Sequence, residues 1–481
     1  MLRLILKQAN WGVMGAVFGF AVGFFVKIYL IDIVGLSEWG KYVTAQTFSS
    51  ISETFLSIGI PYVIIKFIPS FVEKNKDKAS RIANVFLKYA FIVGCIYLVL
   101  IYFGSSYINR LIYKDIDDLS WILFIMCIHV PISMLFGVVV SLYRSVLKIK
   151  EIVLYGSFIA VSVRAILTFV IFQYTDDISH FILIEVFTQI LVLFILLYLF
   201  TKNEFTIFVK SATKEVTTDS KMVDYGKKMF YNSVIAFISA QALSFIISIK
   251  LPLADVGAYN ILLTLTGLTT FLLINLNKVF APAISKLYNE NKITELNDLY
   301  KKTTFLINLF TIPLAIIIAI FSDEILALYT ADMLDYKSYL FFMLAGGMLS
   351  LAAGSSGTFM VMAGLEKQNL HIQIVRAIGL IILSLWLIPI IGLLSVVILY
   401  VVFMLFVNAT QLIYIAKHIK ISPFSTELLV LFTLTIISMY FAIYQDYSFE
   451  IYHYFLVPIM VYLLYFILML NPLKRLIKEL S

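Results

Sequence analysis

Apolar stretches of about 20 residues recur along the whole chain, and they constrain the fold more than any other feature of the sequence. A helix of that length crosses the roughly 30 Å hydrocarbon layer of a bilayer, whereas a soluble core needs no run so long. Charged residues make up only 14% of the chain, against about 25% in soluble domains. The sequence therefore predicts an all-α integral membrane protein.

Hydrophobic windows predict about fourteen spanning helices. The division near Pro389 and Gly392 depends on these two residues as turn formers, and one broken helix there would lower the count by one. The first apolar run is expected to be retained, because no small-residue cleavage site follows it. The predicted spans lie near 10–32, 42–70, 82–103, 121–142, 152–173, 180–200, 229–249, 257–282, 303–321, 338–363, 371–391, 393–415, 424–444 and 453–470.

Lysine and arginine are distributed unequally between the two sets of loops that alternate along these spans. The set that includes both termini carries 25 of them, and the other set carries 5. Lysine- and arginine-rich loops face the cytoplasm, so both termini are predicted to be cytoplasmic. An odd number of spans would place Lys474, Arg475 and Lys478 outside, which the same rule disfavours.

Two short sequences nearly half the chain apart resemble each other. LSEWGKY at 36–42 and LADVGAY at 253–259 match at an offset of 217, and Asn75-Lys76 matches Asn291-Lys292 at an offset of 216. Six predicted spans separate the two copies, so both enter the membrane in the same direction, as in transporters that rock two parallel-related bundles around a central site. We predict a six-helix bundle over 1–205, a cytoplasmic linker over 206–228, a second six-helix bundle over 229–418 and two extra helices in 419–481.

The stretch 36–71 resembles a known family. It contains LSEWGKY, then Gly59-Ile60-Pro61 and Lys66-Phe67-Ile68-Pro69, and it is similar to the polysaccharide-transporter branch of the multidrug/oligosaccharidyl-lipid/polysaccharide (MOP) flippase superfamily, which includes Wzx-type flippases. The resemblance implies a MATE-like fold in the bacterial cytoplasmic membrane. It also implies that the protein moves an undecaprenyl-pyrophosphate-linked oligosaccharide, as an O-antigen, capsule or exopolysaccharide unit, from the inner to the outer leaflet.

Motifs for other chemistries are missing from the sequence. No G-x-x-x-x-G-K-[ST] loop for ATP occurs, the five histidines have no zinc-ligand spacing, and no G-x-S-x-G is present. We therefore expect no enzymatic activity, no cofactor, no metal and no nucleic-acid partner. Energy would come from an ion gradient or from the substrate concentration.

Charged residues inside the predicted spans are the candidate site residues, because each costs about 2.5–3.5 kcal/mol at mid-membrane. Cations predominate and suit a pyrophosphate, for which arginine provides a planar fork and lysine a point charge. Arg164 lies near mid-helix, whereas Lys66, Lys278, Lys88 and Arg376 could instead extend toward the headgroups. The predicted substrate-binding residues are Arg164, Lys27, Arg376, Lys66 and Lys278, and the predicted ion-coupling residue is Glu53. Glu185, about one turn from the outer surface, could equally be interfacial.

Three classes of protein compete for this sequence. A lipid-linked oligosaccharide flippase accounts for the repeat, the cations and the N-terminal resemblance; its partners would be the substrate, membrane lipids and a polysaccharide polymerase. A MATE-like ion-coupled multidrug exporter would share the fold, but a cavity for cationic drugs should favour acids. A membrane polysaccharide polymerase or ligase usually carries a large outer loop, which the predicted spans leave no room for. We favour the flippase.

Overall fold

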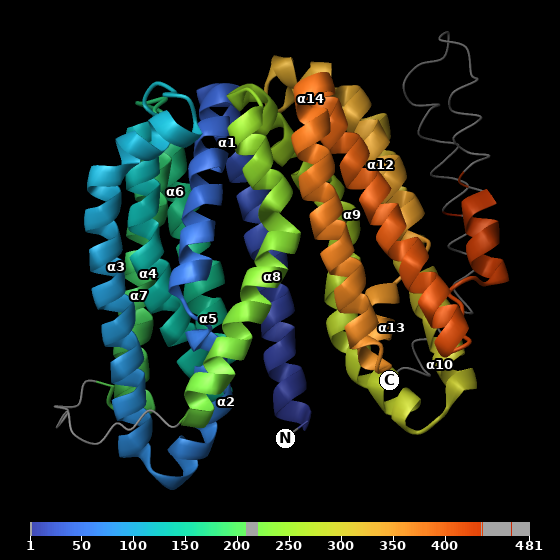
Figure 1. Ribbon diagram of the computed structural model, residues 1–481, viewed down its shortest axis with the longest axis horizontal. Coiled ribbons are helices and arrows are strands. Elements are labelled where there is room, and N and C mark those ends of the chain that lie inside the picture. The colour runs from blue at the N-terminus through green and yellow to red at the C-terminus, as the bar shows by residue number, and fades with distance from the viewer. Residues whose placement is uncertain (1, 208–219, 434, 436–462, 464–481) are drawn as a thin grey trace. The chain divides into compact units, whose positions relative to one another are not determined.

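The computed structural model describes residues 2–207, 220–433, 435 and 463, and no strand occurs among them (Figure 1). Eight helical stretches in these ranges are long and apolar enough to cross a membrane. The predicted all-α membrane fold is confirmed, while the count of about fourteen spans stays a prediction. The two extra helices predicted in 419–481 lie largely outside the described residues.

The chain divides into two compact units. Unit 1 comprises residues 1–258 and 328–330, and unit 2 comprises 259–327 and 331–481. The helices that begin in unit 1 are α1 (Leu2–Leu56), α2 (Ile60–Lys74), α3 (Lys76–Ile112), α4 (Leu119–Ser145), α5 (Ile149–Ile152), the π-helix η1 (Val153–Ile159), α6 (Ala160–Ile171), α7 (Ile178–Asn203), α8 (Ser220–Lys250) and α9 (Leu253–Asn289). Those of unit 2 are α10 (Ile293–Ile320), α11 (Ser322–Ala327), the 3₁₀ helix η2 (Ala331–Tyr336), α12 (Lys337–Leu351), α13 (Ser356–Met362) and α14 (Glu366–His418).

The two longest helices each contain a kink where the sequence predicts a boundary between spans. In α1 the backbone leaves the helical region at Gly35, with φ 82° and ψ 170°. In α14 it does so at Ile391 and at Gly392, which has φ 55°. Glycine adopts positive φ without a steric penalty, so it is the residue expected at such a joint. The predicted boundary at Gly392 therefore corresponds to a real break in helical geometry.

Two predicted elements are corrected by the structure. A continuous helix over 42–70 is wrong, because α1 ends at Leu56 and α2 begins at Ile60. Gly59 between them has φ +69°, and the proline after Ile60 fits the first turn of α2, where a missing N–H costs nothing. The predicted linker over 206–228 is also too long, because α8 begins at Ser220; its residues 208–219 lie outside the described part.

Helix α4 lies at the centre of unit 1 and packs against α1, α2, α3 and α7. Figure 1 shows α3, α4 and α7 side by side. The approach of α3 to α4 is close, since a Cβ added at Gly94 would lie 2.4 Å from the Pro131 side chain. Small residues allow helices to pack this closely in a membrane, where van der Waals contact replaces the hydrophobic effect. The apolar packing around α4 fixes the helices of unit 1 relative to one another.

The two repeated motifs touch each other within unit 1. A Cβ added at Gly40 would lie 1.9 Å from the Leu253 carbonyl oxygen, and one added at Gly257 would lie 2.4 Å from the Leu36 carbonyl oxygen. The contact is therefore reciprocal: each glycine packs directly against the backbone of the other motif. Only residues without a side chain permit such an approach of two helices. The glycines shared by LSEWGKY and LADVGAY thus have a structural reason.

The predicted span 338–363 in unit 2 is broken into α12 and α13. Gly354, between them, has φ +57° and lies against the Thr304 side chain. The break is held by hydrogen bonds to its backbone: the Tyr300 hydroxyl donates to the Ala353 carbonyl at 2.8 Å, and Asn308 Nδ2 donates to the Leu351 carbonyl at 2.8 Å. Unpaired backbone groups are costly in a membrane, so these side chains compensate for the interrupted helix.

Candidate functional site

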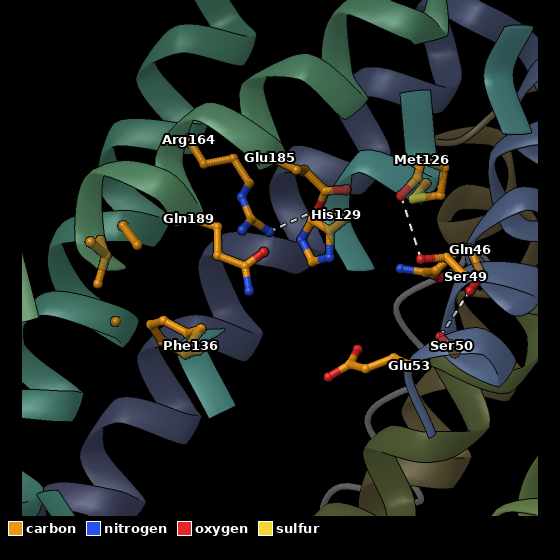
Figure 2. A pocket seen from close by; sticks show the side chains of 13 residues that line it. Gln46, Ser49, Ser50, Glu53, Met126, His129, Phe136, Arg164, Glu185 and Gln189 are labelled. Carbon is orange, nitrogen blue, oxygen red and sulfur yellow. Dashed lines mark hydrogen bonds and ion pairs between the residues drawn. The ribbon is translucent and has the colours of Figure 1, made fainter. Parts of the chain in front are cut away.

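A polar pocket of about 330 Å³ lies within unit 1, among α1, α4, η1, α6 and α7 (Figure 2). It is unusual for a helical bundle in a bilayer, because polar groups at membrane depth are expensive and mark substrate or ion pathways. Apolar side chains such as Met126, Phe136 and Val192 complete its wall. Its polar lining consists of Gln46, Ser49, Ser50, Glu53, His129, Arg164, Glu185 and Gln189.

The positions of these side chains agree with helical periodicity. Glu185 and Gln189 are four residues apart on α7, so they lie on one face of that helix. Arg164 lies on α6, directly after the π-helix η1, whose Gly156 also lines the pocket. A π-helical turn inserts an extra residue and rotates the next segment of the helix, and such turns are frequent at functional sites.

Arg164 forms an ion pair with Glu185 inside the pocket. Its Nη1 lies 2.8 Å from Glu185 Oε1, and the two side chains are 30% and 11% exposed, respectively. The other carboxylate oxygen, Oε2, accepts a hydrogen bond of 2.9 Å from the Tyr42 hydroxyl. Gln46 Nε2 in turn donates to the Tyr42 oxygen at 3.1 Å. Glu185 is therefore buried inside the protein and paired through both of its carboxylate oxygens.

Several polar atoms around this pair have no partner among the described residues. Arg164 Nε is buried without an acceptor, and Gln189 Oε1 is buried without a donor. Gln189 Nε2 donates to the Ser133 hydroxyl at 3.1 Å, and that hydroxyl lies 2.9 Å from His129 Nδ1. Unsatisfied buried groups cost free energy, and a ligand or a water that reached these atoms would remove that cost.

Glu53 is the second acid of the pocket. Figure 2 shows its carboxylate directed into the open space. It forms no ion pair with any described residue. The pocket thus contains one arginine and two glutamates, together with His129. The structure places Arg164 and Glu53 in one pocket, and this pocket has no cationic excess.

The other candidate cations lie elsewhere. The Lys27 ammonium is 5.2 Å from the centre of the Trp39 ring, and that of Lys66 is 3.7 Å from the centre of the Tyr225 ring. Neither lysine lines the pocket. Arg376 belongs to unit 2, where its Nη1 lies 3.5 Å from Gln373 Oε1 and its Nε is buried without an acceptor among the described residues. The side chain of Lys278 lies outside the described part.

Sequence reasoning missed Gln46 as a pocket residue, and it also missed the pairing of Glu185 with Arg164 and Tyr42. Tyr42 belongs to the repeated motif, so the sequence indicated where it lies in the fold. The sequence did not indicate its hydrogen-bond partner. Its hydroxyl meets a residue 143 positions along the chain. Such a contact depends on which faces of α1 and α7 pack together, and no local pattern in one sequence specifies that.

Long apolar helices with a polar, ion-paired pocket among them define a multi-pass membrane protein. A model of the family described as polysaccharide biosynthesis protein matches residues 32–336. The chain belongs to this family. The resemblance noted at residues 36–71 is thereby confirmed at the level of the family, and no curated protein matches the chain.

Solved structures with the same fold are transporters. The lipid II flippase MurJ in an inward closed conformation has a TM-score of 0.73 at 15% identity, covering 96% of this chain and 99% of that one. An inward-facing multidrug resistance MATE transporter of the MOP superfamily has a TM-score of 0.64 at 13% identity, covering 82% and 98%. A MOP superfamily transporter from Pyrococcus furiosus has a TM-score of 0.58 at 13% identity, covering 87% and 95%. At these identities the likeness concerns the fold.

Proposed function

We propose that the protein is a flippase that moves an undecaprenyl-pyrophosphate-linked oligosaccharide from the inner to the outer leaflet of the bacterial cytoplasmic membrane by alternating access. Its membership of the polysaccharide biosynthesis family supports a glycan substrate. The likeness in fold to a lipid II flippase supports a lipid-linked one. Both termini would be cytoplasmic, as the loop charges predict.

The observation that carries the proposal is Arg164, a guanidinium in a polar pocket with one donor still unused. Its Nη1 faces Glu185, but its Nε is buried and has no acceptor among the described residues. Arginine binds phosphate oxygens through a planar fork, which makes it better suited than lysine to this role. Gln46, His129 and Gln189 provide the hydrogen-bonding groups that sugar hydroxyls need.

The other residues have lesser roles in this proposal. Lys27 and Arg376 would assist at other stages of the passage, and Lys66 and Lys278 would attract the anionic head group. Glu53, an acid without an ion-pair partner among the described residues, would bind the coupling ion. Alanine substitution of each residue, followed by a measurement of polymer export in a flippase-deficient strain, would rank their contributions to transport.

Complementation of a flippase-deficient strain tests the proposal. Arg164→Ala should abolish polymer export at normal protein level, and Arg164→Lys should retain part of it, because the charge survives but the fork does not. Arg164→Ala leaves the Glu185 carboxylate buried without its partner, which is expected to destabilise the protein. Adding Glu185→Gln removes that charge, so loss of export in the double variant reflects loss of function and not instability. Arg110→Ala, at an exposed position near the end of α3, is the control and should export normally. Full export by the Arg164→Ala variants would refute the proposal.

One observation favours a second candidate function, a multidrug exporter. The described pocket contains Glu53 and Glu185 against a single arginine, and acids suit cationic drugs. Expression in a drug-sensitive strain would distinguish the two functions: an exporter raises resistance to cationic compounds and loses that effect on Glu53→Gln. A flippase leaves resistance unchanged and restores polymer export.

A further inference from the structure

Both oxygens of the Glu185 carboxylate are occupied, one by Arg164 and the other by Tyr42. The distances are 2.8 Å from Oε1 to Arg164 Nη1 and 2.9 Å from Oε2 to the Tyr42 hydroxyl. A carboxylate presents oxygens to a guanidinium in much the same geometry as a phosphate does. Glu185 therefore occupies a guanidinium donor of Arg164, its Nη1, that a pyrophosphate oxygen would also bind (Figure 2).

We infer that Glu185 is an internal competitor for Arg164: its carboxylate neutralises the arginine in the empty protein, yields it to the substrate's pyrophosphate, and takes it back when the substrate leaves. This inference rests on the proposed function and adds a role in substrate release. Tyr42 anchors the carboxylate on its far oxygen, so Glu185 has a hydrogen bond to keep when the arginine turns away.

The geometry allows such an exchange. The Arg164 side chain is 30% exposed, and it borders the pocket rather than being enclosed with its partner. Its Nε is buried without an acceptor among the described residues, so it gains a partner when the guanidinium turns from Glu185 toward a phosphate oxygen. Gln189, one turn along α7 from Glu185, has a free Oε1 that can accept from Arg164 or from a sugar hydroxyl during the exchange.

A competitor also resolves a conflict in the energetics of transport. A site that conducts its cargo must bind it well enough to load and weakly enough to unload. An unpaired arginine would be costly in the empty state and would hold a pyrophosphate too firmly afterwards. The carboxylate lowers both of these costs, because the empty site is neutralised and the departure of the phosphate restores an ion pair.

Binding of farnesyl pyrophosphate to the purified full-length protein in detergent tests the inference. Glu185→Gln keeps the shape of the side chain and removes its charge, so affinity should rise roughly tenfold or more and dissociation should slow. A merely structural ion pair predicts the reverse, because breaking it would disturb the site. Glu185→Asp withdraws the carboxylate from Arg164 while keeping its charge, and it should give a smaller increase.

Glu53→Gln is the matched control, because it removes the same charge from the same pocket without touching Arg164. Its effect on affinity should be clearly smaller than that of Glu185→Gln. Equal increases in affinity for both variants would overturn the inference, since the loss of any negative charge from the pocket would then explain the effect. Unchanged or weaker binding in both folded Glu185 variants would also overturn it.

Arg164→Ala separates this inference from the proposed function. If Arg164→Ala loses the probe while Glu185→Gln binds like the wild type, the competitor is refuted and the phosphate role of Arg164 stands. If Arg164→Ala binds like the wild type, the proposed function itself fails. Melting temperature and elution volume establish that each variant compared is folded.

Discussion

The contact between the repeated motifs can be tested by adding one methyl group. Gly40→Ala would place a Cβ 1.9 Å from the Leu253 carbonyl oxygen, a distance that real Cβ atoms essentially never show. The obstructing atom belongs to the backbone, so no side-chain rotation relieves the clash. Ordinary contact begins at 3.4 Å, and the two helices must therefore separate locally by about 1.5 Å.

Such overpacking costs about 1–3 kcal/mol in well-packed interiors. In a purified membrane protein the loss appears as a lower melting temperature, measured by tryptophan fluorescence or by exposure of buried cysteine to a thiol dye. Cys127 is buried and free, so it can report the unfolding once the exposed Cys95 is replaced by serine. Gly257→Ala should behave similarly, because its Cβ would lie 2.4 Å from the Leu36 carbonyl oxygen.

Gly19→Ala, also on α1, is the matched control because nothing lies within 4 Å of its added Cβ. Alanine is favoured over glycine in a helix by roughly 0.5–1 kcal/mol, so this variant should melt at or slightly above the wild-type temperature. Equal melting temperatures for Gly40→Ala and Gly19→Ala would refute the argument that the motifs are in close contact.

Three further predictions concern other parts of the chain. Gly354→Ala should lower the melting temperature, because its φ of +57° is strained for alanine and its Cβ would lie 2.1 Å from Thr304 Oγ1; an unchanged value would contradict the positive φ. Tyr300→Phe should destabilise the protein by about 1–3 kcal/mol, measured by thermal unfolding, because a carbonyl at the α12–α13 break loses its buried hydrogen bond of 2.8 Å. Reporter fusions after Ser220 and after Ser481 should both show a cytoplasmic location, and periplasmic reporter activity at either would contradict the predicted topology.

The fold class could be predicted from the sequence because its cause is local. A bilayer requires long apolar helices, and hydropathy measures that requirement directly. The kink at Gly392 was also predictable, since Pro389 restricts the helical backbone and Gly392 permits the positive φ that a joint requires.

The interruptions inside spans were harder to predict. Gly59 and Pro61 lie at the junction of α1 and α2, and both were visible in the sequence, yet hydropathy stays high across them. The same is true of the small residues between α12 and α13, where Gly354 has positive φ. Hydropathy detects how apolar a segment is and not whether its helix is continuous, because membrane proteins satisfy a broken backbone with neighbouring side chains.

A counter-charge or a polar pocket beside Arg164 could be predicted from the sequence, whereas the chemistry around it could not. The cost of a mid-span cation indicated that it faces water or a counter-charge, and the structure shows a partner, Glu185. The identity of the partner depends on how α6 packs against α7 and on the approach of Tyr42 from α1. These are contacts between distant segments, which periodicity within one helix leaves undetermined.

Counting charges in spans also misjudges how much charge a substrate encounters. The sequence shows an excess of intramembrane cations, but the ammonium groups of Lys27 and Lys66 lie over aromatic rings, and Arg164 is paired with an acid. A cation inserted in a bilayer needs a local compensation to be stable there at all. A ligand therefore meets only the donors left over after that compensation. In the described pocket the Nε of Arg164 is one such donor, buried and without an acceptor among the described residues, and the proposed phosphate binding has to account for it.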